Sequence, residues 1–393
     1  MERIYLDYAA TAPMKKEVLD AMLPYFTENF GNPSAIYRLG AEAKRAVEES
    51  RKQIAKTIGA RPEEIFFTGS GTEADNWAIT ALAGRISPQK QHIVTSAIEH
   101  PAILSSCKEM ERRGYEVTYL KPDIEGRISP KALKDALRPD TALVSVMMAN
   151  NEIGTKEPVE ELAAICREQG VVFHTDAVQA YGKLSICVGD SPISMMSVGA
   201  HKIGGPKGVG FLYVNREIPL FPLIFGGAQE KRKRAGTENV PGIVGFAKAA
   251  ELAFADREAE EKRLTKLRDC FIDRVLKEIP CVRLTGPREE RLSGHASFLF
   301  DYVEGETLLI LLDVEGICAS SGSACTVGQA AGSHVLRAIG IADEDGHGAL
   351  RFTMGADTTE EMLDKTVECL KGITCRARKM SPYAHEFEKR MNR

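Results

Sequence analysis

The chain has 393 residues, which is long enough for two domains, because single hydrophobic cores stop growing below that length. Its hydrophobic content of 44%, charged content of 27% and net charge of −4 indicate a soluble globular protein without the basic surplus that attracts nucleic acid. No run approaches the roughly 20 apolar residues of a membrane span, and the start MERIYLDYAATAP lacks the pattern of a signal peptide, so a cytoplasmic protein that does not contact the membrane is expected.

Helical patterns alternate with short apolar runs between about residues 39 and 214, which predicts an α/β domain with a largely parallel sheet. The helical patterns supply the crossovers that parallel strands need; two of them are GAEAKRAVEESRKQIAKTIGA and PVEELAAICREQG. The expected strands are β-rich runs that end at turn or polar residues: HIVTSA, EVTYL, ALVSVMMA, VVFHTDA, ISMMSVGA and GVGFLYV.

The charge-dense stretch from Gly242 to Glu278 predicts a long helical connection. Beyond it, ASFLFDYV, ETLLILLDVEG, a Gly/Ser loop, LRFTMG and a last helix predict a smaller α+β domain. The final SPYAHEFEKRMNR is polar and is expected to fray. We therefore predict a large domain over 15–257 and a small domain formed by 1–14 and 258–393.

Nine cysteines are scattered along the chain without a CxxC pair, which argues against a disulfide scaffold and against a metal site of the zinc type. Most of them are expected to be buried small hydrophobic residues. Cys325 differs, because its loop CASSGSACTVGQAAG offers few side chains large enough to bury it. An exposed thiol without a role is a liability, so Cys325 is the candidate for reactivity.

Ligands of open α/β sheets bind at the carboxyl ends of parallel strands, so the polar residues that follow the strands are the first candidates for a site. Lys202 follows ISMMSVG and precedes glycines that allow close approach of another group, and a lysine there can supply a reactive amine. Lys207 in the same loop is a rival, and a lysine beside a turn is usually a solvated surface residue. Asp176 ends VVFHTDA, where it could pair with a cationic ring nitrogen, although an isolated Asp after a strand is more often a helix N-cap.

Three further strand ends carry candidate residues. The turn GSGTEADN, residues 69–76, leads from IFFT into a helix and offers free backbone N–H groups to a phosphate, as many such turns do. His100 follows SAIE and Asn151 follows ALVSVMMAN, and a lone histidine is more often capping or packed than catalytic. Arg351, in ALRFTMG, has a planar guanidinium that can bind both oxygens of a carboxylate. No single residue is decisive, but a lysine, an acid, a phosphate cradle and an arginine at strand ends of one chain are not expected by chance.

Other motifs run along nearly the whole chain: YLDYAATAP, GNPSAIYRLGAEAKRAVEESR, TGSGTEADNWAI, EHPAIL, NNEIGT, HTDAVQAYGK, AHKIGGPKGVGFLYV, AGTENVPGIVG, SSGSACT and SHVLRAIG before LRFTMG. Together they resemble the NifS/IscS-like cysteine desulfurases, of the class V aminotransferase family and of pyridoxal phosphate (PLP) fold type I. The SSGSACT loop with a spacer before SHVLRA resembles the long-loop subgroup. The resemblance implies a large α/β domain with a mostly parallel sheet and a smaller α+β C-terminal domain.

The resemblance also implies where the ring of PLP would lie. Lys202 would hold the cofactor covalently and remove a proton from the substrate, and Asp176 would pair with the pyridine nitrogen. Gln179 would contact the ring hydroxyl, and His100 would stack on the ring and help to move protons. Asn151 would lie against the cofactor and would fix the substrate carboxylate together with the arginine of LRFTMG, Arg351.

The phosphate of PLP would be held by Gly71 and Thr72 at a helix start, by His201, and by Thr237 of a second subunit. That last contact implies a homodimer. Family members commonly have Ser where this chain has Gly199, so one phosphate contact is expected to be missing and PLP to be retained less tightly.

In the reaction that the resemblance implies, the thiolate of Cys325 attacks the sulfur of L-cysteine, leaving a persulfide and alanine. The resemblance implies a sulfur acceptor that is an iron–sulfur scaffold or a tRNA-thiolation enzyme. Because the C-terminal tail lacks the motif by which housekeeping members dock the iron–sulfur scaffold, the acceptor could instead be the tRNA-thiolation enzyme or another carrier. In QAAGSHVL, where relatives usually show an acidic residue and a proline before Ser-His, the anchor of the cysteine loop is expected to differ.

Two alternatives stay open at this point. One is a relative on the same fold, such as a selenocysteine lyase or a serine–pyruvate or phosphoserine aminotransferase, but transamination needs no thiol like Cys325 on a loop. The other is a catalytically silent scaffold that binds sulfur carriers, against which the joint presence of Lys202, His100, Asp176 and Cys325 weighs.

Overall fold

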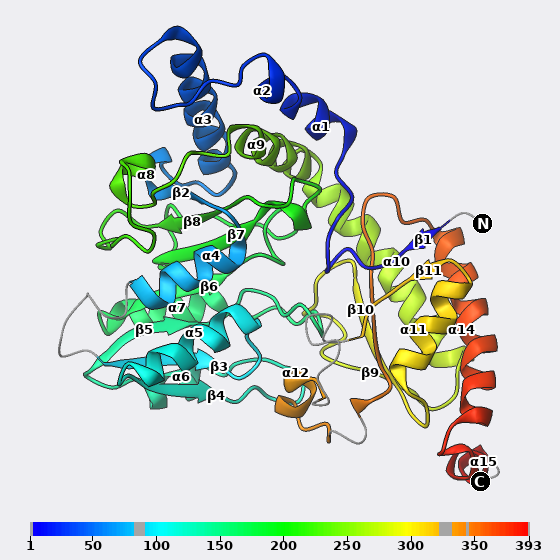
Figure 1. Ribbon diagram of the computed structural model, residues 1–393. Helices are drawn as coiled ribbons and strands as arrows, with labels where there is room; N and C mark the ends of the chain where they lie inside the picture. Colours follow the sequence, from blue (N-terminus) through cyan, green and yellow to red (C-terminus); the bar gives the residue numbers. More distant parts are fainter. Residues whose placement is uncertain (1–2, 82–90, 322–331, 343–345, 392–393) are drawn as a thin grey trace.

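The computed structural model describes residues 3–81, 91–321, 332–342 and 346–391. A seven-stranded sheet in the order β2-β8-β7-β6-β5-β3-β4 has helices on both faces (Figure 1). Strands β7, β6, β5, β3 and β4 run parallel to one another, while β8 is antiparallel to both β7 and β2. The prediction of an α/β fold with a mostly parallel sheet is confirmed. The strands are β2 (Ile65–Thr68), β3 (His92–Ser96), β4 (Glu116–Leu120), β5 (Thr141–Ser145), β6 (Val172–Asp176), β7 (Met195–Gly199) and β8 (Gly210–Val214).

Both faces of this sheet are buried, which explains why its strands are almost continuously apolar. Phe66 and Leu143 pack against α4 and α5 on one face. The next residue of each strand, Phe67 and Val144, points to the other face and packs with α3, α7 and α9. The helices and turns around the sheet are α1 (Lys16–Met22), α2 (Pro24–Thr27), α3 (Arg38–Thr57), η1 (Pro62–Glu64), α4 (Gly71–Asn76), η2 (Trp77–Ala81), α5 (Pro101–Arg112), α6 (Pro130–Ala136), α7 (Val159–Glu168), η3 (Ala200–Lys202), α8 (Gln229–Arg232) and α9 (Val240–Ala255).

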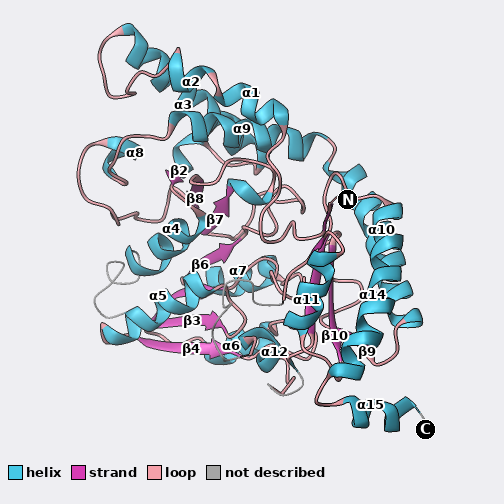
Figure 2. Ribbon diagram, turned by 45° about the vertical axis from the view of Figure 1, so that its right-hand side comes forward, coloured by secondary structure: helices cyan, strands magenta, loops and turns pink. Residues whose placement is uncertain are grey.

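A second, smaller layer of strands and helices lies beside the large sheet (Figures 1 and 2). It contains an antiparallel sheet in the order β12-β10-β9 and a parallel pair, β1 with β11. Its hydrophobic core joins Ile4 and Leu6 of the N-terminal segment to residues from 264 onward, and on this core we base the proposed domain division. Its elements are β1 (Ile4–Tyr5), α10 (Arg257–Glu278), β9 (Val282–Leu284), β10 (His295–Phe300), α11 (Gly305–Val314), β11 (Ile317–Cys318), α12 (His334–Ala338), β12 (Ala349–Thr353), α14 (Glu360–Met380) and α15 (Ala384–Met391).

The connection expected from Gly242 to Glu278 consists of two helices rather than one. Asp256, at φ −121° and ψ 23°, interrupts the helical backbone between α9 and α10. The apolar α9 packs against α3 on the large sheet, whereas Phe271 and Val275 of α10 belong to the core of the smaller part. Because of this break, α9 packs in the core around the large sheet and α10 packs in the core of the smaller part.

The C-terminal segment forms helix α15, so the expectation that this polar tail frays was wrong over Ala384–Met391. None of its residues is buried. The ring of Phe387 lies 4.9 Å from the guanidinium carbon of Arg378 and 6.0 Å from the ring of Tyr302, and these contacts hold the helix against α14. No helix among the described residues is both long and apolar enough to span a membrane.

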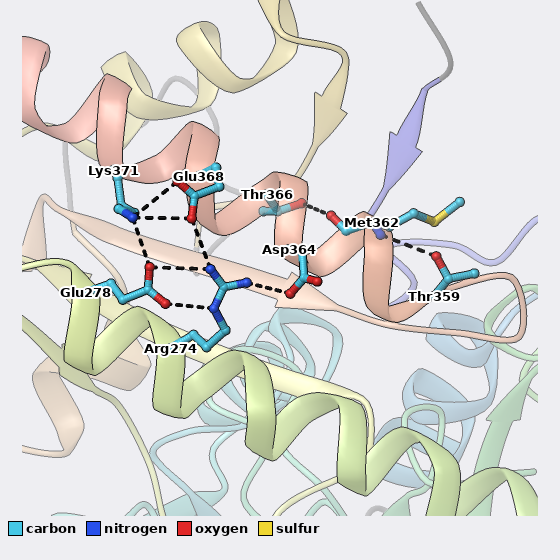
Figure 3. A network of polar contacts seen from close by, with 8 residues as sticks. All are labelled: Arg274, Glu278, Thr359, Met362, Asp364, Thr366, Glu368 and Lys371. Atoms are coloured by element: carbon cyan, nitrogen blue, oxygen red, sulfur yellow. Dashed lines mark hydrogen bonds and ion pairs between the residues drawn. The ribbon is translucent and has the colours of Figure 1, made fainter.

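Figure 3 shows a group of charged side chains that links α10 to α14. Arg274 donates to Glu278 at 2.7 Å within α10 and reaches Asp364 and Glu368 on α14. Lys371 of α14 forms an ion pair with Glu278 of α10 at 3.0 Å. Because these side chains are partly solvated, each pair contributes little, and the network matters mainly for the register of the two helices.

Candidate active site

Three of the residues that the sequence singled out come together at the carboxyl ends of β3, β6 and β7. His100 begins α5 shortly after β3, Asp176 is the last residue of β6, and Lys202 ends the turn that follows β7. Burial raises the pKa of Asp176, and the positive charges of His100 and Lys202 act on the same carboxyl in the opposite direction. The three side chains thus share one electrostatic environment.

Lys202, and not its rival Lys207, faces this site. Its ammonium group donates hydrogen bonds to the carbonyl oxygens of Ala9 at 2.6 Å and Ala10 at 2.7 Å, in the segment that follows β1. The side-chain amide of Gln179 donates to the same carbonyl of Ala9 at 2.9 Å. Lys207 is exposed. The N-terminal segment therefore closes one side of the site around the Lys202 amine.

Asp176 is suited to a cationic ring nitrogen. Its side chain is buried, Oδ1 accepts a hydrogen bond from the N–H of Val178 at 2.8 Å, and no described residue forms an ion pair with it. It caps no α-helix, because a turn rather than an α-helix follows β6. A buried carboxylate without a fixed cation is costly, and a protonated pyridine nitrogen would offset that cost.

His100 is the N-cap residue of α5, as its place at a helix start suggested. Its Nδ1 accepts a hydrogen bond from the N–H of Ala102 at 3.1 Å, which assigns the ring proton of the neutral form to Nε2. Burial lowers the pKa of His100, against the effect of the Asp176 charge, and the charge of Lys202 lowers it further. A neutral ring with a free Nε2–H can both pack against an aromatic cofactor and donate a proton.

The start of α4 meets the turn after β6 closely enough to require glycine. A Cβ on Gly71 would lie 2.6 Å from Cγ2 of Val178. Ser70 caps the helix by accepting from the N–H of Glu73 at 3.1 Å, whereas the N–H groups of Gly71 and Thr72 have no acceptor among the described residues. Such a helix start is suited to a phosphate, and helical backbone continues beyond α4 into η2.

Two more of the expected phosphate ligands lie around this helix start. His201 is half-buried beside Thr11, with Nδ1 3.3 Å from its hydroxyl, and burial together with the charges of Lys202 and Lys207 lowers the pKa of His201 to about 4. Thr237 is exposed and lines a small cleft with Gly69, as a residue offered to another subunit would.

The guanidinium of Arg351 is held from two sides and keeps one donor unused. Nη1 donates to the carbonyl of Asn151 at 2.9 Å, and Nη2 pairs with Oδ1 of Asp7 at 2.8 Å. The residue is only 2% exposed, yet its Nε has no partner among the described residues. A buried donor without an acceptor costs free energy, and a substrate carboxylate would supply the acceptor. Cys325 itself lies outside the described residues.

Sequence reasoning missed several buried polar groups behind these residues. Lys183 donates to Oε1 of Gln179 at 3.4 Å, and burial with the charges of Lys202 and Arg351 lowers the pKa of Lys183 to about 7. Glu99, next to His100, is buried, and burial raises its pKa to about 8. The only signal for such groups is a charged or polar residue inside an apolar run, as in SAIEH.

The expectation that most cysteines are buried was wrong. Of the eight that the structure describes, only Cys107 and Cys166 are buried, and burial raises the pKa of each thiol to about 12. The cysteines that lie exposed on the surface are Cys187, Cys270 and Cys375. Cys187 lies in the loop between β6 and β7, and Cys270 and Cys375 lie on exposed faces of α10 and α14.

Comparison with known proteins agrees with this arrangement. The family model described as aminotransferase class-V matches residues 4–366. The chain therefore belongs to the class-V aminotransferase family, in which PLP is the cofactor.

Within that family the chain is similar to proteins named cysteine desulfurase. It is 50% identical to "Cysteine desulfurase IscS" of Dictyoglomus turgidum over 98% of both chains, and 48% identical to the protein of that name from Methanosarcina thermophila over 96% of this chain and 94% of the other. A solved "NifS-like protein" superimposes with a TM-score of 0.89 at 35% identity, covering 95% of this chain and 99% of the other. A structure titled "SspA in complex with cysteine" gives a TM-score of 0.78 at 36% identity, covering 89% and 98%.

Proposed function

We propose that this chain is a PLP-dependent cysteine desulfurase, which releases L-alanine from L-cysteine and keeps the sulfur as a persulfide on Cys325. The observation that carries the proposal is the convergence of Lys202, His100 and Asp176 at three strand ends. It occurs in a chain that is 50% identical, nearly end to end, to a protein named cysteine desulfurase.

The chemistry of the described residues fits PLP. Lys202 would hold the cofactor covalently, Asp176 would face the ring nitrogen, Gln179 the ring hydroxyl, and His100 and Asn151 would lie against the ring. The phosphate would lie at the start of α4, between Gly71, Thr72 and His201 of one chain and Thr237 of a second subunit. When bound, PLP withdraws the electrons that are left on the α-carbon of the substrate after deprotonation.

The protein residues supply binding and proton transfer. The buried Nε–H of Arg351 has no acceptor among the described residues, so it can donate to the substrate carboxylate beside Asn151. Meanwhile Nη2 stays paired with Asp7. The amine of Lys202, once released from the cofactor, takes the α-proton. The Nε2–H of His100 is placed to give a proton to the departing product.

Sulfur transfer replaces the carbon–sulfur bond of the substrate with a sulfur–sulfur bond to the enzyme. The thiolate of Cys325 forms a bond to the sulfur of the substrate, and the bond between that sulfur and the substrate β-carbon breaks. The electron pair of the broken bond stays with the carbon fragment, which takes up two protons to become alanine. The net change is cysteine plus a thiol giving alanine plus a persulfide, without an external oxidant.

The test is a reaction of the purified holoenzyme with L-cysteine and a thiol reductant, in which sulfide and alanine are both measured. The wild type is expected to release sulfide and alanine in equal amounts, and so is the Cys187→Ala variant, which changes an exposed cysteine away from the site. Neither product is expected from Cys325→Ala, although its PLP absorbance should persist. Alanine from no variant would overturn the proposal and favour a silent scaffold, and preference for selenocysteine over cysteine would favour a lyase.

We further propose that the protein acts in the cytoplasm as a homodimer and passes its sulfur to an acceptor protein, either an iron–sulfur scaffold or a tRNA-thiolation enzyme. The exposed apolar side chains of Phe26, Phe30 and Ile36 support a subunit interface, as does the exposure of Thr237. A dimer of one Lys202→Ala chain and one Thr237→Ala chain tests this. If each site takes its threonine from the other subunit, the Thr237→Ala chain supplies Lys202, the Lys202→Ala chain supplies Thr237, and one complete site forms. Activity equal to that of unmixed Thr237→Ala would contradict it.

A further inference from the structure

Lys202 and Lys183 line one cavity, which lies between the N-terminal segment, the break that separates α9 from α10, and the residues that follow β12. Its volume is about 310 Å³. Its lining includes the exposed residues Asp256 and Asp357, so the cavity is open to solvent there. The apolar side chains of its wall include Ile203, Leu252, Leu264, Leu292 and Met354. Solvent protons therefore have a route into a space that both lysines share.

The backbone fixes where Lys183 stands. It is the last residue of HTDAVQAYGK and follows Gly182, whose φ of 75° is a left-handed conformation. A Cβ on Gly182 would lie 2.8 Å from Cγ2 of Ile203, so this position requires glycine. The N–H of Lys183 donates to the carbonyl of Ala180 at 2.9 Å. The turn that follows β6 therefore holds Lys183 at the cavity.

A short chain of hydrogen bonds connects the two lysines. The ammonium group of Lys183 donates to Oε1 of Gln179 at 3.4 Å. The amide nitrogen of Gln179 donates to the carbonyl of Ala9 at 2.9 Å, and Lys202 donates to the same carbonyl at 2.6 Å. The two amines are therefore separated by one amide and one carbonyl group, which keeps them near each other.

Lys183 has no fixed counter-ion. No described residue forms an ion pair with it, and the charges that act on it are those of Lys202 and Arg351. Burial, and then these two positive charges, lower the pKa of Lys183 to about 7. The other titratable residues of the cavity wall are Tyr8, Lys15, Asp256, Glu260, His295 and Asp357. An amine that is charged and neutral in comparable amounts near neutral pH can both accept and give up a proton.

We propose that Lys183 is a proton relay that acts through Lys202: it takes up the proton that Lys202 removes from the substrate and exchanges it with solvent through the cavity. The inference deepens the proposed function and rests on it. One N–H bond of Lys202 breaks as one N–H bond of Lys183 forms, and Lys183 then loses a proton to solvent, so no other bond changes. The reverse path supplies Lys202 with a solvent hydrogen, which it gives to the α-carbon of alanine.

Substitutions at position 183 separate the proton from the charge. Lys183→Arg keeps a positive charge and N–H donors for Gln179, but a guanidinium does not give up its proton in a protein. Lys183→Met removes the charge, the donors and the proton together. Lys183→Ala leaves room for imidazole, a small base that titrates near neutral pH. Lys131→Met, on an exposed face of α6, is the matched control.

The first measurement follows the α-hydrogen of the substrate. Holoenzyme in excess reacts once with L-cysteine that carries deuterium on its α-carbon, and the deuterium in the released alanine is measured. An ammonium group holds three equivalent hydrogens, so without exchange Lys202 should return about one third of the deuterium. We expect that fraction from Lys183→Met, Lys183→Arg and Lys183→Ala, and at least about threefold less from the wild type and Lys131→Met. Imidazole should lower the fraction in Lys183→Ala toward the wild-type value and leave that of Lys183→Arg unchanged.

The second measurement needs neither cofactor nor substrate, and it uses no variant. Trace acetylation of the wild-type apoprotein at a series of pH values, read by mass spectrometry of its peptides, reports the pH at which each lysine amine loses its proton. The amine of Lys183 should become reactive around its pKa of about 7. The exposed Lys131 should become reactive only at the ordinary lysine value of about 10.4 or above.

Three results would overturn the inference. Deuterium retention by Lys183→Arg equal to that of the wild type would show that Lys183 supplies only charge or a hydrogen bond. Equal retention in Lys183→Met and the wild type would show that the proton of Lys202 exchanges by another route. A Lys183 amine that titrates with Lys131 would hold its proton at neutral pH and could relay none. Absence of alanine from the wild type would mean that the proposed function fails, and the inference with it, whereas an active wild type with any of these three results would remove the inference alone.

Discussion

Oδ1 of Asp7 lies 2.8 Å from Nη2 of Arg351, so the second residue after β1 and the middle residue of β12 form an ion pair across 344 positions of the sequence. The pair lies where the two small sheets meet, because Asp7 also forms a bridge with Thr353. Asn151 of the large part holds Nη1 of the same guanidinium. One arginine thus joins the N-terminal segment, the small sheet and a turn of the large part at the proposed substrate site.

Arg351→Lys should weaken the binding of cysteine more than it slows the reaction of bound substrate. A lysine keeps the charge opposite Asp7 but cannot present two N–H groups to one carboxylate. Loss of one charge-assisted hydrogen bond, about 1.5–3 kcal/mol, predicts a rise in KM of about tenfold or more. Asp7→Asn is the matched control, since its amide oxygen can still accept from Nη2, and its effect on KM should be smaller. An unchanged KM in Arg351→Lys would remove this arginine from the substrate site.

Gly199→Ser should bind PLP more tightly. A Cβ on Gly199 would come no closer than 3.6 Å to any neighbouring atom, and that neighbour is the backbone nitrogen of Gly71 at the start of α4. There is room for a hydroxyl next to the phosphate, and one added hydrogen bond of about 1 kcal/mol predicts roughly a fivefold lower Kd. Gly199→Ala fills the same space without the hydroxyl and serves as control. Equal PLP release from Gly199→Ser and Gly199→Ala during dialysis would contradict the prediction.

Glu278→Gln should lower the melting temperature at neutral pH and have less effect in acid. Hydrogen bonds from Arg274 and Lys371 lower the pKa of Glu278 to about 2 (Figure 3). With its pKa depressed on folding, this carboxylate stabilises the native state above its unfolded pKa of about 4.3, and the contribution is lost as the pH falls toward 2. The difference in melting temperature from the wild type should also shrink in high salt, because the pairs are solvated. A difference that is independent of pH and salt would indicate lost packing instead.

The strands could be predicted because burial on both faces leaves long apolar runs, but burial alone does not mark where pairing ends. The run ALVSVMMA was expected to be strand throughout, whereas the regular strand β5 ends at Ser145, and beyond it only Val146 and Met148 still donate to carbonyls of β6. The interruption at Asp256 has no signal in a stretch of good helix formers. Both differences arise from tertiary packing, which decides what a locally ambiguous segment does.

The site could be predicted where its residues stand at strand ends, as Lys202 and Asp176 do. It could not be predicted where a buried acid depends on a distant partner. Glu152 resembles a solvated charge in sequence, and its partner Ser333 lies 181 residues away. Local patterns carry no information about such a pair, because its geometry depends on how the two parts of the chain pack.

Glu99→Gln should change how stability depends on pH. Burial raises the pKa of Glu99 to about 8, so the folded protein keeps this proton up to about that pH, whereas the unfolded chain loses it near pH 4.3. Between these values the unfolded state binds fewer protons, and the stability of the wild type therefore falls as the pH rises.

Glutamine is neutral in both states and can still accept from Ser96 and from the N–H of Met147 through its Oε1, as Glu99 does. Among the described residues, Oε2 of Glu99 has no partner, so the variant places an unpartnered amide NH2 there, which adds a destabilisation that does not vary with pH. Relative to the wild type, the denaturation midpoint of the Glu99→Gln holoenzyme should therefore rise steadily between pH 5 and pH 8, whereas the exposed Glu168→Gln should follow the wild type. Parallel curves for the Glu99→Gln protein and the wild type would mean that this carboxyl ionises in the folded protein as it does in water.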